Sequence, residues 1–180
     1  MQQMSILTDV VNRLEQGSIA YALTGSVAMS CYVPERTTVD VDIVIQLGRD
    51  QAADIVALFE SGYYIDRGAV DEAIRLARSF NVIHCGGLLK VDFIVRRSSA
   101  LLRQRFERRR RLIVGDIQVW VLSPEDLILA KLEWMRTSRS ERQRADVPGL
   151  LTRLSDLDHG YLSASARRLG ITDLLDEARE

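Results

Sequence analysis

Cysteine is scarce in this chain of 180 residues, which contains Cys31 and Cys85 and no others. Two cysteines cannot form a disulfide framework or a four-ligand zinc site, so we expect a reduced, cytoplasmic protein. Long apolar runs are also absent, because no segment approaches the roughly 20 residues that a membrane helix needs. The N-terminal segment carries Asp9 and Glu15 and lacks the basic-then-apolar order of a signal peptide. The sequence therefore predicts no membrane association.

Net charge is nearly absent as well, since 24 basic and 25 acidic side chains leave a formal charge of −1. This balance argues against a general nucleic-acid coat, although it allows a local basic patch. Lysine is the rarest charged residue: Lys90 and Lys131 stand among basic positions that are otherwise all arginine. Each lysine is therefore a candidate for a specific role, the alternative being a coding bias. A hydrophobic content of 47% excludes a disordered chain.

The spacing of apolar residues predicts a mixed α/β region over the first two thirds of the chain. Helices are expected at 4–14, 27–32, 51–59 and 70–77, and strands at 19–23, 39–45, 80–84, 89–95, 111–114 and 118–122. Two turns with glycine, Gly86-Gly87 and Gly115-Asp116, predict that the last four strands form two hairpins.

The character of the sequence changes after Leu122. Ser123 followed by Pro124 and two acidic residues is typical of a helix start, with a capping hydroxyl and negative charge in the first turn. Helices are then expected at 127–135, 147–154, 161–169 and 172–178, with breaks near Pro148 and Gly160. We therefore predict a core over 1–122 and a helical subdomain over 123–180.

Two carboxylates occupy an otherwise apolar strand. Asp40 and Asp42 alternate with Val39, Val41 and Ile43, so on a strand they project from the same face, about 6.6 Å apart along the chain. Placing two like charges on a buried strand costs free energy unless a cation lies between them. Oxygen ligands of this kind suit magnesium or manganese, which retain water and bind substrate phosphates.

A third acid, Asp92, lies inside a second apolar strand. If the two strands are neighbours, Asp92 joins Asp40 and Asp42 in one patch, as a two-metal site requires. Gly25-Ser26 comes before the first acidic strand, where glycine allows close backbone approach to a phosphate and the following helix start favours anions. The combination of this turn with the two-acid strand is far more specific than either part.

These motifs resemble those of the DNA polymerase β-type nucleotidyltransferase superfamily. The matching segments are Thr24-Gly25-Ser26-Val27-Ala28 and Arg36-Thr37-Thr38-Val39-Asp40-Val41-Asp42-Ile43-Val44. The chain looks most similar to small members, the minimal nucleotidyltransferases and the AbiEii-type toxin relatives. The resemblance implies an α+β fold, with a mixed β-sheet core, flanking helices and a C-terminal helical lobe.

The resemblance also implies roles for individual residues. Asp40 and Asp42 would be metal ligands, and Asp92 the third ligand or the base for the attacking hydroxyl. Gly25 and Ser26 would hold the nucleotide phosphates. In two further matches, Arg36 would position a phosphate or brace its loop, and Lys131 would neutralise the triphosphate or the leaving pyrophosphate. Asp146, close to Arg142 and Arg144, matches the family pattern loosely.

The predicted activity is therefore transfer of a nucleoside monophosphate from a nucleoside triphosphate such as ATP to a hydroxyl, with Mg²⁺ or Mn²⁺ as cofactor. The acceptor stays open between RNA or tRNA, a protein side chain and a small molecule. A toxin with a cognate antitoxin is one version of this prediction. The first alternative is an inactive nucleotide- or RNA-binding module of the same fold. A glycosyltransferase that uses Asp-x-Asp with manganese ranks lower, because it would need a longer chain.

Several arginines and one tryptophan allow two interpretations each. The segment with Arg103, Arg105 and the run 108–111 is either a nucleic-acid patch or a solvated edge strand, and we favour the edge strand. A second group lines a cleft or covers a wet helix surface: Arg136, Arg139, Arg142 and Arg144. Trp134 is expected in the core or between domains, with a place in a substrate pocket as the alternative.

Overall fold

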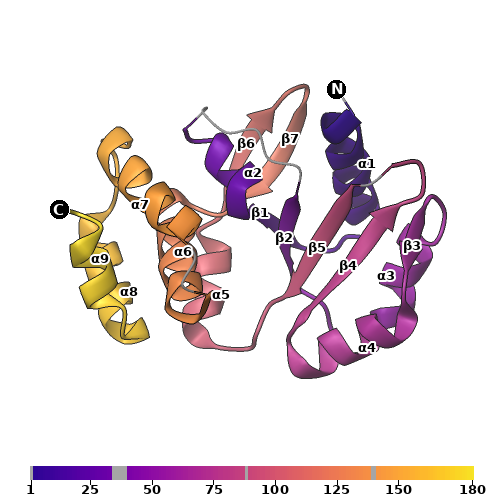
Figure 1. The fold of residues 1–180 in the computed structure, drawn as a ribbon. Coiled ribbons are helices and arrows are strands. Elements are labelled where there is room, and N and C mark those ends of the chain that lie inside the picture. Colours follow the sequence, from indigo (N-terminus) through magenta and orange to yellow (C-terminus); the bar gives the residue numbers. More distant parts are fainter. Residues whose placement is uncertain (1, 34–39, 88, 139–140) are drawn as a thin grey trace.

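A computed structural model describes residues 2–33, 40–87, 89–138 and 141–180 of the chain (Figure 1). The side chains of residues 2, 137–138 and 141–145 lie outside the description. None of the helices in the described part is long and apolar enough to cross a lipid bilayer.

The strands of the described residues form one mixed sheet in the order β3-β4-β5-β2-β1-β7-β6. They are β1 (Tyr21–Thr24), β2 (Val41–Ile45), β3 (Tyr63–Ile65), β4 (Ser79–His84), β5 (Lys90–Val95), β6 (Arg110–Val114) and β7 (Ile117–Val121). β4 pairs with β5 and β6 with β7 in the antiparallel sense, which confirms both predicted hairpins.

Helices flank the sheet and continue beyond it to the C-terminus (Figure 1). They are α1 (Gln2–Gln16), α2 (Gly25–Ser30), α3 (Ala52–Phe59), α4 (Arg67–Leu76), α5 (Ala100–Glu107), α6 (Pro124–Ser138), α7 (Glu141–Arg153), α8 (His159–Leu169) and α9 (Thr172–Glu177). In Figure 1, α6 to α9 lie together on the side opposite α3 and α4. The predicted α+β class, with a mixed sheet and flanking helices, is confirmed.

The two acidic strands are neighbours in the middle of the sheet. β2 and β5 run parallel, and their register sets Asp42 beside Asp92. β1 runs antiparallel on the other side of β2 and sets Thr24 beside Asp42. Because Thr24 is the last residue of β1, Gly25 begins α2 directly next to the same aspartate. The topology therefore collects the glycine turn and two of the predicted acids at one point.

The faces of β2 differ because its residues alternate. Val41, Ile43 and Ile45 are buried and belong to the apolar core that α1, α3 and α4 share with the sheet. Asp42 and Val44 lie on the opposite face and are half-buried. β5 has the same pattern, with half-buried Asp92. A two-residue period thus places the acids on the face that the core helices leave open.

A second apolar cluster holds the C-terminal helices together. It contains Leu132, Val147, Leu162 and Leu175, and it reaches Met29 in α2. The first turns of α6 join both clusters, because Leu127 packs with the sheet and Ile128 with the C-terminal helices. The division at residue 122 stays a prediction.

Three local features depart from the sequence expectations. The short edge strand β3 and helix α5 were not expected, although Ser99 caps α5 by accepting a hydrogen bond from the amide of Leu102. The predicted break near Pro148 is wrong, since α7 continues through this residue. Proline removes one helical hydrogen bond, but its neighbour Val147 and nearby Leu150 are fully buried, and their packing maintains the helix.

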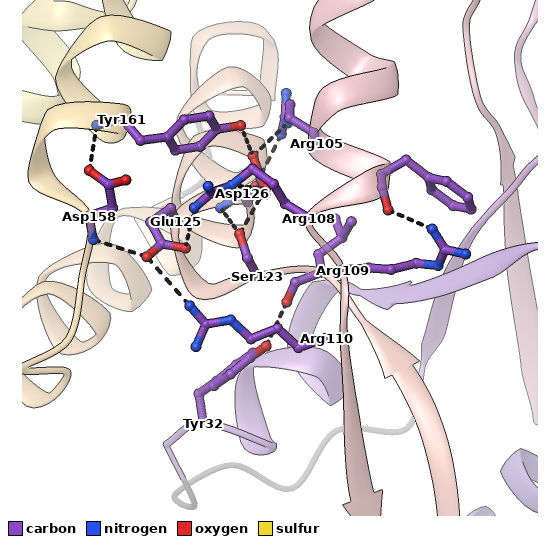
Figure 2. A network of polar contacts seen from close by, with 12 residues as sticks. Tyr32, Arg105, Arg108, Arg109, Arg110, Ser123, Glu125, Asp126, Asp158 and Tyr161 are labelled. Atoms are coloured by element: carbon purple, nitrogen blue, oxygen red, sulfur yellow. Dashed lines mark hydrogen bonds and ion pairs between the residues drawn. The ribbon is translucent and has the colours of Figure 1, made fainter.

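A buried polar network ties α5 and β6 to the start of α6 and to α8 (Figure 2). Asp126 is fully buried and accepts hydrogen bonds from the hydroxyls of Ser123 at 2.7 Å and Tyr161 at 2.8 Å. Arg105, itself only 5% exposed, donates to the backbone oxygen of Asp126 at 3.1 Å and pairs with Glu133. Burial raises the pKa of Asp126, although these partners oppose the shift.

The run of arginines at 108–111 is partly used inside the molecule. Arg108 and Arg110 lie 3.4 Å and 3.8 Å from the buried carboxylate of Glu125. Arg109 stacks on the rings of Phe106 and Trp120. β6 is an edge strand of the sheet, as favoured from the sequence. Because two of these arginines neutralise a buried acid, the run is a weak candidate for a nucleic-acid patch.

Replacing Arg105 by methionine should destabilise the fold strongly. The change removes the buried cation that lies 3.5 Å from Asp126 and leaves the partly exposed Arg108, 3.6 Å away, as a neighbouring cation, so we expect a cost of about 3 kcal/mol of unfolding free energy. Urea denaturation checks this value. Arg103→Met on the exposed side of the same helix is the matched control and should change stability by less than about 0.5 kcal/mol. Equal effects of the two variants would show that the network contributes no stability.

Candidate functional site

A pocket of about 400 Å³ lies between the open face of the sheet and α6. Four of the residues predicted from the sequence line it: Gly25, Asp42, Asp92 and Lys131. The remaining lining comes from Thr24, Ser79, Ile94, Leu127, Ala130 and Trp134. The structure thus brings a positive-φ glycine, two acids and a lysine from four separate elements to one cavity.

The two acids of the pocket influence each other. Burial, followed by the negative charges of Asp92 and Asp40, raises the pKa of Asp42 to about 6. Lys90 lies 2.8 Å from Asp92 and forms an ion pair with it. The hydrogen bond to Asp92 raises the pKa of Lys90, and the charges of the neighbouring acids act in the same direction. The site therefore holds excess negative charge that a cation would balance.

Asp40 lies one residue before β2 rather than on the strand, and it is exposed. Its charge still reaches the site, since it contributes to the raised pKa values of Asp42 and Lys90. Among the described residues, no group of three acidic, histidine or cysteine side chains is arranged to hold a metal ion. Asp42 and Asp92 are the carboxylates in the lining of the pocket, and they could hold a cation together with the water and phosphate oxygens that Mg²⁺ retains.

Position 25 requires glycine for two reasons, the backbone conformation and the side chain that lies next to it. Its φ of +64° lies in the left-handed region that disfavours side chains. A Cβ atom added there would lie 2.1 Å from Oδ2 of Asp42. Ser26 follows in α2 but does not line the pocket. The close approach of backbone to carboxylate is therefore specific to the glycine.

Gly25→Ala should lower stability and distort the acid pair. Gly170 is the matched control, because it has a similar φ of +66° but open space around its Cβ position. Gly170→Ala should cost about 1–2 kcal/mol from backbone strain alone. Gly25→Ala should cost about 1–3 kcal/mol more, since it also overpacks against Asp42. Urea denaturation of the two variants measures the difference, and equal losses would contradict the contact.

Lys131 lies on α6 and is 4% exposed. Its Nζ lies 2.8 Å from Oδ2 of Asp146, which is 2% exposed. The positive charge also acts to lower the pKa of Asp42 across the pocket. The loosely matched Asp146 is thus the counter-ion that holds the lysine at the pocket wall.

Other predicted residues have mixed outcomes. Arg36 and Arg139 lie outside the described residues, as do the side chains of Arg142 and Arg144. Arg136 donates to the carbonyl of Leu169 and does not line the pocket.

Trp134 is 60% exposed and lines the pocket, so its expected place in the core is wrong. The sequence offered one indication of this position, because a residue three places after Lys131 lies on the same face of a helix as the lysine. Ser79, at the start of β4, also lines the pocket and had no signal in the sequence.

Several solved structures share this fold at low sequence identity. The antibiotic-resistance factor ANT(2″)-Ia, in complex with adenylyl-2″-tobramycin, matches with a TM-score of 0.67 and 11% identity, over 94% of this chain and 99% of that one. The lincomycin-bound lincosamide antibiotic adenylyltransferase LnuA matches at 0.56 and 13%, over 82% and 96%. An antigenic nucleotidyltransferase-like protein from Paracoccidioides brasiliensis matches at 0.57 and 17%, over 98% and 92%.

Sequence comparison supplies the family. No curated protein matches the chain significantly. A family model described as a nucleotidyltransferase of unknown function, DUF6036, matches residues 2–159. This match spans the whole sheet, α6 and both partners of the Lys131–Asp146 pair. The chain therefore belongs to this family of nucleotidyltransferases, as its glycine turn and acidic strands predicted.

Proposed function

We propose that this protein transfers a nucleoside monophosphate from a nucleoside triphosphate to a hydroxyl acceptor, with a divalent cation held by Asp42 and Asp92. The observation that carries the proposal is the register of β2 and β5, which sets the two acids side by side next to Gly25. The charge of Asp40 adds to the same negative region. Mg²⁺ or Mn²⁺ fits these hard oxygen ligands, and the described lining of the pocket contains none of the histidine and cysteine ligands that would favour zinc.

The chain's own groups have complementary roles in the proposal. The acceptor oxygen bonds to the α-phosphorus while the bond from that phosphorus to the bridging oxygen of pyrophosphate breaks. Asp92 takes the proton of the acceptor hydroxyl, and Lys131 neutralises the departing pyrophosphate. Gly25 lets the backbone lie close to the carboxylate of Asp42 in the pocket lining, where the nucleotide phosphates would approach. The cation, when bound, stabilises negative charge on the phosphate oxygens.

Two named relatives direct the first choice of acceptor. ANT(2″)-Ia was solved with adenylyl-2″-tobramycin and LnuA with lincomycin, so a small hydroxylated molecule is the acceptor we propose. RNA and protein acceptors are the other arms of the test. A role as a toxin with a cognate antitoxin would follow if the label moves to RNA or protein.

The test uses ATP labelled at the α- or γ-phosphate, with Mg²⁺ or Mn²⁺ and with small hydroxylated molecules, total RNA or cell extract as acceptor. Transfer of the α-label with release of pyrophosphate is expected, while the γ-label stays out of the product. A double variant, Asp42→Asn with Asp92→Asn, should lose transfer. The matched control, Asp54→Asn with Asp116→Asn, removes two exposed acids that do not line the pocket and should keep transfer.

Three results would contradict the proposal. Movement of the γ-label would indicate phosphoryl transfer. Nucleotide binding without transfer, unchanged in the double variant of the site, would indicate an inactive binding module. An equal loss of transfer in the control variant would show that the loss in the site variant comes from its changed net charge.

A further inference from the structure

A second and larger pocket continues from the candidate site. Its volume is about 650 Å³, and it shares Thr24, Ser79, Ile94, Ala130 and Trp134 with the first pocket. Val44 and Ile94, each two residues beyond an acid on the same face of the sheet, form its floor. Leu102 and Phe106 of α5 form an apolar wall. The two pockets are therefore parts of one groove along the open face of the sheet.

The two ends of this groove carry opposite charge. Asp42 and Asp92 mark the first end, whereas four arginines line the second: Arg78, Arg96, Arg97 and Arg105. Glu133 is the sole carboxylate in that second lining, and it already forms an ion pair with Arg105. Arg78 lies 3.6 Å from Glu72.

Arg96 and Arg97 form no ion pair with a carboxylate among the residues that the structure describes. The guanidinium of Arg96 donates to the side chain of Gln46 at 3.0 Å and contacts the ring of Phe106. Its Nε is buried and has no hydrogen-bond partner. Burial and the nearby charge of Arg103 lower the pKa of Arg96, and the charge of Glu107 acts against them. Four arginines thus concentrate positive charge at this end, and two of them, Arg96 and Arg97, have no direct ion pair among the described residues.

We infer that the arginine end of the groove binds a negatively charged group of the acceptor, a phosphate or carboxylate, whose flat or apolar body lies against Trp134. This inference rests on the proposed function and adds the substrate class to it. Arginine forms paired hydrogen bonds with phosphate and carboxylate oxygens, so Arg96 and Arg97 suit such a group. A polycationic aminoglycoside such as tobramycin would be repelled there.

The spacing of the two ends supports the acceptor as occupant. Arg96 follows Asp92 by four residues along an extended chain, which separates their backbones by about 13 Å. A triphosphate held at Gly25 and Asp42 leaves the arginine end free for a second molecule. An acceptor that spans this distance would place its hydroxyl beside the acids and its anionic group beside the arginines.

The test measures binding by calorimetry in EDTA, with adenosine 5′-monophosphate and adenosine as probes that differ by one phosphate. The wild-type protein should bind the phosphorylated probe at least about tenfold more tightly. Arg96→Gln with Arg97→Gln should reduce this preference to about twofold or less. Arg167→Gln with Arg168→Gln, two exposed residues of α8, removes the same charge and should keep the preference.

A second variant covers the case in which the double substitution unfolds the protein. Arg97→Gln alone changes an exposed residue and leaves the contacts of Arg96 intact, and it should still weaken the preference. A trinucleotide RNA serves as a third probe. Tighter binding than the monophosphate identifies a nucleic-acid end as the source of the phosphate, and weaker binding identifies a small molecule. Either ranking of the trinucleotide and the monophosphate supports the inference, provided that the binding of the tighter probe depends on Arg96 and Arg97.

Equal affinity for the two adenosine probes, or a preference that survives loss of both arginines, would overturn the inference. A preference for the phosphorylated probe that rises sharply with Asp42→Asn and Asp92→Asn, where two repelling carboxylates are removed, would place the phosphate at the acid end and would also overturn it. The assay contains no metal and requires no transfer. Failure of nucleotidyl transfer would therefore leave this result unaffected, and the two failures are distinguishable.

Discussion

Asp42→Asn is expected to reduce nucleotidyl transfer by at least about a thousandfold, because it removes a ligand whose cation supplies several kcal/mol at the transition state. The same change should stabilise the metal-free protein. Asp42 is half-buried beside Asp92, and both burial and like charge raise its pKa to about 6. An uncharged amide avoids that repulsion. Activity and stability should therefore change in opposite directions.

The sign of the stability effect follows from proton linkage. A carboxyl group with a raised pKa in the folded state destabilises the fold once it ionises, so the penalty develops from about pH 4 and is complete above about pH 6. Solvent screening reduces the full linkage value, and we expect a gain of about 1–2 kcal/mol for the variant at pH 8. Urea denaturation in EDTA at pH 8 and pH 5 should show the larger gain at pH 8. Asp54→Asn is the control, and a variant less stable than the wild type at pH 8 would contradict the account.

Lys131→Met should lower stability by about 3–5 kcal/mol, because Asp146 would be left as a buried charge without its partner. It should also lower transfer by about a hundredfold through loss of a positive charge at the pocket wall. Urea denaturation and the labelled-ATP assay measure the two effects on the same samples.

The double variant Lys131→Met with Asp146→Leu separates the two roles of the lysine. Replacing a buried ion pair by apolar residues is often neutral, so most of the lost stability should return. Transfer should stay low, because the positive charge on the α6 wall of the pocket is gone and Lys90 stays paired with Asp92. Recovery of both properties would show that Lys131 has a structural role alone.

The acidic residues could be predicted from the sequence because the pattern that marks each of them lies within a few neighbouring residues. Asp42 and Asp92 each interrupt an apolar strand, and the two-residue period places each on the face opposite the buried valines. Their adjacency could not be derived in this way. β2 and β5 are parallel and separated in the chain by α3, β3, α4 and β4, so their pairing depends on the topology of the whole sheet. The resemblance to a known family supplied that information.

The arginine end of the groove was not visible in the sequence. It requires α5, whose few apolar residues give a weak helical period, and it requires Arg96 and Arg97 to follow β5 directly. An arginine in the sequence also does not reveal its partner: Arg105 is buried against Asp126, whereas Arg97, which precedes the same helix, is exposed. Partners of charged residues are set by tertiary contacts, which spacing along the chain does not determine.

Binding of Mn²⁺ tests most directly whether Asp42 and Asp92 hold a cation together with a nucleotide. Electron paramagnetic resonance can follow it in the presence of α,β-methylene-ATP, which resists transfer. We predict that the wild-type protein and the Asp54→Asn/Asp116→Asn control bind Mn²⁺ with the analogue, and that Asp42→Asn/Asp92→Asn does not. Equal Mn²⁺ binding by the last variant, with its fold intact, would contradict the account.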